Sequence, residues 1–196
     1  NASNAVLLLA LVCVCIASQK GVRIKAASQT FLSPQEAGFD VTVQENHWNG
    51  AIVGPESGSA PSVNILKFYL SNVPKGATII KAEFKQRMFV VPKEVALETY
   101  LVDSNWRPNE VTWADMPKKL DRVDKRAISP TQAQCEGGGY DISMDVTEAV
   151  KKMITKGSDA VSFLQTTDDK VTILQVYTMH HTDKKATPTL SVKYTI

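Results

Sequence analysis

Basic side chains recur at alternate positions in the segment from Ile80 to Val90. Lys81, Lys85 and Arg87 share one parity, and apolar residues such as Phe84 and Met88 hold the other. Successive side chains of a β-strand point to opposite faces, so a strand here predicts a basic face and a core face. Lysine and arginine are the side chains that bind carboxylates and other anions. The spacing therefore predicts an anion-binding surface.

Other residues are expected to extend this surface. Lys67 lies in a second strand-like segment, Asn64–Leu70, and a ring from Tyr177 could lie beside the cations. The alternative is an ordinary solvated face, because charged residues alternate on any exposed strand. The candidate ligand-binding residues are Lys67, Lys81, Lys85, Arg87, Tyr177, His180 and Lys184.

Catalysis has little support in the sequence. A nucleophile–base pair needs a histidine near serine or cysteine, and the only histidines are His47, His180 and His181. There is no H-E-x-x-H zinc motif and no nucleophile elbow. We therefore expect no enzymatic activity, with a polysaccharide-degrading enzyme as the weakest alternative.

Acidic turn residues could bind a structural calcium ion. No other cofactor is expected. Carboxylates at strand ends can hold Ca²⁺, but isolated acidic turn residues are more often simply solvated. The candidate ligands are Glu45, Asp168, Asp169 and Asp183.

The N-terminal segment predicts a secreted protein. Ala5–Ala17 is apolar, uncharged and closed by small residues, and it is too short to span a membrane. We expect residues 1–17 to be a signal peptide, with a buried core helix as the alternative, and 18–196 to be one domain. Cys135 is then the only cysteine left, so no internal disulfide is expected.

Charge and hydropathy argue against nucleic acid and membrane as binding partners. The formal net charge is +2 and the pI is about 8.4, which is too mild for a dedicated nucleic-acid binder. No second long apolar segment follows, so no membrane insertion is expected.

The elements that position the candidate residues are mainly short strands. Nine or ten strand-like segments and one helix, Val146–Lys156, predict an all-β sandwich. Gln29–Phe39 and Lys118–Arg126 are predicted to be connections. The tryptophan loop, Asp103–Pro117, carries Trp106 and Trp113, and we expect it to plug one end of the core, with a ligand platform as the alternative.

Several motifs in order resemble the DNRLRE domain, which is also carbohydrate-binding module family 96. They are Asn64–Ser71, Val73–Ile79, Asn105–Trp106 with Glu110–Trp113 and Pro117, Asp145–Thr147, and Ala186–Leu190 before the last strand. The resemblance covers about Val22 to Ile196. Lys67 stands at the family's Arg/Lys position, whereas Tyr69 replaces an acidic residue.

The resemblance implies a jelly-roll-like antiparallel β-sandwich with one short helix. It also implies a secreted, extracellular, non-catalytic module that binds acidic polysaccharide such as alginate, or other matrix macromolecules. The expected role is that of an extracellular or skeletal matrix component. A structural matrix protein without a defined sugar ligand is the alternative.

Overall fold

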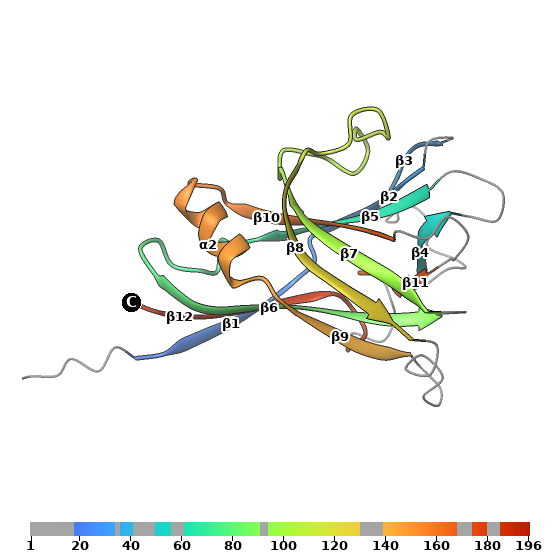
Figure 1. The fold of residues 1–196 in the computed structure, drawn as a ribbon. Helices are drawn as coiled ribbons and strands as arrows, with labels where there is room; N and C mark the ends of the chain where they lie inside the picture. The colour runs from blue at the N-terminus through green and yellow to red at the C-terminus, as the bar shows by residue number, and fades with distance from the viewer. Residues whose placement is uncertain are drawn as a thin grey trace, which may run out of the picture.

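The fold is a β-sandwich in a computed structural model that describes residues 18–33, 36–40, 50–55, 61–90, 94–129, 139–167, 174–179 and 185–196. Two antiparallel sheets lie face to face, with one short helix at the side (Figure 1). The predicted all-β, jelly-roll-like sandwich with one short helix is therefore confirmed. None of the described helices is long and apolar enough to cross a bilayer.

Sheet A is built around β6, its longest strand. β12 and β11 pair with the first and last parts of β6 on one side, and β9 pairs on the other. β1 extends the sheet beyond β12, and β4 extends it beyond β11. The strands of sheet A are β1 (Lys20–Lys25), β4 (Gly50–Pro55), β6 (Thr78–Val90), β9 (Tyr140–Asp145), β11 (Leu174–Tyr177) and β12 (Thr189–Thr195).

Sheet B has the strand order β3-β2-β5-β10-β7-β8, and a short β4–β5 pairing links it to sheet A. Its strands are β2 (Ser28–Ser33), β3 (Glu36–Asp40), β5 (Pro61–Tyr69), β7 (Val95–Val102), β8 (Lys119–Ile128) and β10 (Ala160–Thr167).

The main core fills the space between the sheets. Phe68 and Phe163 from sheet B meet Phe84 from sheet A, with ring centroids 5.3–6.1 Å apart. Helix α2 (Thr147–Thr155) adds Val150 and Met153 to this core. The helix ends at Gly157, whose φ of +72° suits glycine, and the amides of Gly157 and Ser158 satisfy its last carbonyls.

A second apolar cluster lies on the outer face of sheet B. Ile65, Val102 and Leu164 point away from the main core and are covered by Trp106 and Val111 of the tryptophan loop. The loop therefore covers a sheet face, and the expectation that it plugs an end of the core is wrong. This cover explains why β10 is buried on both faces over its first six residues.

Two segments that we expected to be connections contain strands. Part of Gln29–Phe39 forms β2 and β3, and Lys118–Arg126 lies almost wholly in β8. β8 is the edge of sheet B and exposes both faces over most of its length. An edge strand of this kind needs no apolar alternation, so its charges concealed it in the sequence.

Candidate functional site

The neighbouring strands β1, β12 and β6 of sheet A bring a set of cations to one outer face. Lys193 of β12 lies opposite Lys81 of β6, and Thr189 separates Lys25 of β1 from Lys85 of β6. The intervening residues Leu190 and Val192 are buried in the core, so the alternate positions face outward. We call this surface the basic face; it consists of Arg23, Lys25, Lys81, Lys85, Arg87 and Lys193.

Most of the basic face carries charge that none of the described residues neutralises. Arg23, Lys25, Lys85 and Lys193 are exposed, and within the described residues none of them forms a hydrogen bond or ion pair. Neighbouring strands lie about 4.8 Å apart, so Lys25 and Lys85, two strands apart, are separated by about 10 Å at the backbone. Four unpaired cations on a flat sheet are suited to an extended polyanion.

The two remaining cations lie beside carboxylates. Lys81 Nζ is 3.6 Å from Glu83, and Arg87 is 3.8 Å from Asp141. Arg87 also donates a hydrogen bond of 3.1 Å to the Gly139 carbonyl. Contacts of this length at partly exposed positions contribute little stability, so an anionic ligand can compete with them.

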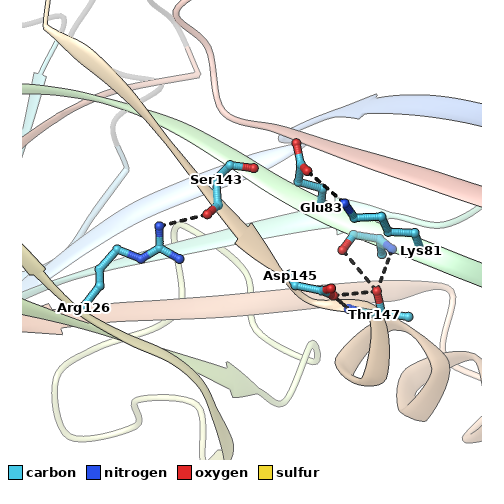
Figure 2. Close-up of polar contacts among 7 residues, drawn as sticks. Lys81, Glu83, Arg126, Ser143, Asp145 and Thr147 are labelled. Carbon is cyan, nitrogen blue, oxygen red and sulfur yellow. Dashed lines mark hydrogen bonds and ion pairs between the residues drawn. The ribbon is translucent and has the colours of Figure 1, made fainter.

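The basic face meets helix α2 at Asp145 and Thr147. Figure 2 shows Lys81 and Glu83 on β6 beside this helix start, with the dashed Lys81–Glu83 contact. Asp145 Oδ1 accepts hydrogen bonds from the Thr147 hydroxyl at 2.6 Å and the Thr147 amide at 2.9 Å. These two bonds hold the pKa of Asp145 below its usual value. The Asp145 carboxylate therefore serves to hydrogen-bond the first residue of helix α2.

Arg126 links the two sheets at the edge formed by β8 and β9. Its guanidinium extends from β8 of sheet B and donates a 2.8 Å hydrogen bond to the Ser143 carbonyl on β9 of sheet A (Figure 2). It is held by Asp124 through bonds of 2.5 and 2.9 Å. Arg126 is thus a structural link between the sheets.

Lys67 does not belong to this surface, and its predicted outward position is wrong. Its side chain is buried, with Nζ donating to the Trp106 carbonyl and lying 4.6 Å from the centre of the Trp106 ring. The indole in turn donates to Ser162 Oγ at 3.0 Å. Burial lowers the pKa of Lys67, opposed by the nearby Asp159. Lys67 fastens the tryptophan loop to sheet B.

The other predicted residues divide into three groups. Lys81, Lys85 and Arg87 share the outer face of sheet A, as expected. Tyr177 is 7% exposed, so its ring is not a surface platform. His180 and Lys184 lie outside the described residues.

The outer face of sheet B near Glu98 also carries cations, but unlike those of the basic face they have partners: Arg122 and Lys125 pair with Glu98, and Lys119 lies over the Tyr100 ring. Glu98 accepts a 2.5 Å hydrogen bond from the Tyr100 hydroxyl and pairs with Lys125 at 3.0 Å. The hydrogen bond from Tyr100, followed by that from Lys125, lowers the pKa of Glu98, and the same carboxylate raises the pKa of Tyr100. Lys119 lies 4.1 Å from the centre of the Tyr100 ring.

Sequence reasoning missed Arg23, Lys25 and Lys193 as members of the site. Each lies in a segment with a visible strand pattern, and its parity places it opposite the apolar residues. The strand order β1-β12-β6 could not be predicted from the sequence. This order places β1 and β12, the first and last described strands, beside β6.

The described residues contain no group of three or more histidine, cysteine, aspartate or glutamate side chains that could hold a metal ion. The candidate calcium ligands Glu45, Asp168, Asp169 and Asp183 lie outside the described ranges, as does Cys135. A calcium site thus remains a sequence-based prediction.

Comparison with known proteins agrees with this architecture. The model of carbohydrate-binding module family 96 matches residues 42–194, which is most of the chain. No curated protein matches the chain. A match of this extent covers both sheets from β4 to β12, including the signature residues Lys67 and Trp106. The chain therefore belongs to carbohydrate-binding module family 96.

Proposed function

We propose that this protein is a secreted, non-catalytic module that binds acidic polysaccharide through the basic face. The observation that supports this most directly is the group of four unpaired cations, Arg23, Lys25, Lys85 and Lys193, on one exposed sheet surface. Membership of a carbohydrate-binding family supplies the general class of ligand. The charge of the face supports the more specific choice of an acidic one.

The chemistry of the face favours a charged sugar over a neutral one. Neutral sugars are usually held by stacking on aromatic rings. None of the outward side chains that the structure describes on β1, β12 and β6 is aromatic. The lysine ammonium groups sit on flexible stems and can follow carboxylates along a chain. Arg23 can hold one carboxylate with two parallel hydrogen bonds.

Nucleic acid is a second kind of polyanion, but the face is less suited to it. Single-stranded nucleic acids are bound by cations together with aromatic rings on which the bases stack. The cations are present here, and no aromatic ring is found among the described outward side chains of β1, β12 and β6. A polyuronate, with its carboxylates on saturated rings, requires only the cations.

Secretion and a matrix role complete the proposal. Secretion is supported by the apolar segment Ala5–Ala17, which has the length and composition of a signal peptide core. The absence of catalysis is supported by the sequence, which has three histidines and no recognisable nucleophile motif. A small binding module with these properties fits an extracellular or skeletal matrix component.

The test is affinity electrophoresis in gels containing alginate. We expect wild-type protein to be retarded, and Lys25→Gln with Lys85→Gln to weaken binding by about tenfold, because each lost contact costs up to about 1 kcal/mol. Lys118→Gln removes an exposed lysine on the tryptophan-loop side and serves as the control. Equal retardation of the face and control variants would refute the proposed surface.

A glycan array separates the proposal from its alternatives. Signals confined to acidic polysaccharides support it, and an empty array supports a structural matrix protein without a sugar ligand. DNA binding as tight as alginate binding would point to a general affinity for polyanions. Release of oligosaccharides from the polymer by pure protein would indicate an enzyme.

A further inference from the structure

A groove lies beside the basic face. It has a volume of about 1200 Å³ and runs between helix α2, β8 and the start of β6. Lys81 and Asp145 line the groove, and both also stand on the outer side of sheet A, where Asp145 is opposite Glu83. The basic face and the groove are therefore contiguous.

A β-bulge exposes an apolar side chain in this groove. Lys81 pairs with Lys193 and Ile79 with Tyr194, so Ile80 is an extra residue with no partner on β12. Ile79 consequently enters the core, whereas Ile80 is 46% exposed and lines the groove. We had expected Ile80 to face the core with Ala82 and Phe84, and the bulge is the reason that it does not. Bulges commonly redirect side chains at functional sites.

Five cations and three carboxylates line the groove, and two carboxylates just outside it, Glu83 and Glu98, pair with Lys81 and Arg122. The cations are Lys81, Arg122, Lys151, Lys152 and Lys156. Lys151 pairs with Glu148 at 2.8 Å and Lys152 with Asp121 at 2.5 Å, but these pairs are exposed and contribute little. Lys156 has no ion-pair partner within the described part of the chain. Among the described residues the groove thus has one unpaired cation, Lys156, together with the exposed apolar side chain of Ile80.

We propose that the α2 groove is a second subsite for the same acidic polysaccharide, which continues into it from the basic face; this inference rests on the proposed function. Ile80 provides the apolar contact for the C–H face of a sugar ring, and Lys156 binds a carboxylate. The flat face alone can hold a short segment of the chain. Face and groove together require a longer one.

Binding should therefore depend on the length of the ligand. Short oligouronates fill the basic face only, whereas the polymer reaches both subsites through Lys81. Ile80→Thr with Lys156→Gln removes the apolar contact and the unpaired cation of the groove. Threonine retains the strand preference of isoleucine, and both positions are at the surface, so the fold should be preserved.

The experiment compares binding of alginate polymer and of short oligouronates by isothermal titration calorimetry. We expect the groove variant to bind polymer about tenfold more weakly and oligouronates as wild type does. The matched control is Tyr69→Thr with Lys118→Gln, which makes the same kinds of change on the sheet B side. Urea unfolding of each variant checks that it is folded.

Two results would overturn the groove proposal while leaving the proposed function intact. One is a groove variant that binds polymer no more weakly than the control does. The other is an equal loss for polymer and oligouronates, which would mean that the groove is not an extension. If wild-type protein binds neither ligand, the proposed function itself fails, and the groove proposal with it.

Discussion

A buried lysine with an aromatic partner has a different role from an exposed one. Lys67 and Trp106 are both parts of the motifs that resemble the family, and the structure shows that they contact each other. The ammonium binds a loop carbonyl and the ring, and the ring's N–H binds Ser162. This pair of signature residues is therefore explained by the attachment of a loop.

Replacing Lys67 should affect stability and not ligand binding. Lys67→Met keeps an unbranched apolar stem but leaves the Trp106 carbonyl without its donor, so we expect a loss of about 1–2 kcal/mol in the free energy of unfolding. The same change at Lys85, which is exposed, should alter stability by less than about 0.5 kcal/mol. Urea denaturation measures both.

Alginate binding of these two variants should show the opposite pattern. Lys67→Met should bind as the wild type does, whereas Lys85→Met should bind more weakly. A stable Lys67→Met protein that has lost binding would return Lys67 to the ligand site and contradict the assignment of a structural role.

At the scale of elements, helix α2 depends on a carboxylate just before it. Val146, at the N-cap position, makes no side-chain capping bond, and Asp145 accepts from Thr147 instead. The motif Asp145–Thr147 was visible in the sequence, and the helix was predicted over Val146–Lys156. The helix was accordingly predicted to within a residue or so at each end.

The pH dependence of stability tests this arrangement. The folded pKa of Asp145 is lowered, so its contribution is complete above the unfolded value near 3.9 and is lost as the pH falls through the folded value. Asp145→Asn keeps an acceptor but does not titrate. We expect it to be about 1 kcal/mol less stable than wild type at neutral pH, and equally stable in strong acid.

Chemical denaturation at a series of pH values measures the difference. Glu94→Gln, at an exposed position before β7, is the control and should follow the wild-type profile. A constant deficit of Asp145→Asn across the series would show that the ionised carboxylate has no special role.

The elements that resisted prediction did so for identifiable reasons. β8 lacks apolar alternation because it is an edge strand. Ile80 breaks the alternation of β6 because a bulge lies at that point. Trp106 and Trp113 were both expected to plug one end of the core, but Trp106 is buried against the outer face of sheet B and Trp113 is only half buried. In each case the deciding contact comes from a strand distant in sequence.

The whole molecule has two unlike faces. The outer side of sheet A carries unpaired cations, whereas the outer side of sheet B is apolar under the tryptophan loop and has paired cations near Glu98. Half of the basic face was predictable, because Lys81, Lys85 and Arg87 share one strand. The other half required the strand order, which no local pattern specifies.

Ionic strength should control ligand retention on the basic face. The screening length falls from about 8 Å at 0.15 M salt to about 3 Å at 1 M, and the unpaired cations are fully exposed to it. We therefore expect NaCl to elute the protein from immobilised alginate, and stability to change little over the same range. Retention that persists at 1 M salt would show that contacts other than charge dominate.

The basic face is assembled from both ends of the described chain. β1 begins at Lys20, β12 ends at Thr195, and they pair side by side next to β6 (Figure 1). Among the described strands, β12, which joins β1 to β6, is the last to be synthesised. The proposed binding surface therefore cannot be complete before β12 has been made, because β12 contributes Lys193 and holds β1, with Arg23 and Lys25, beside β6.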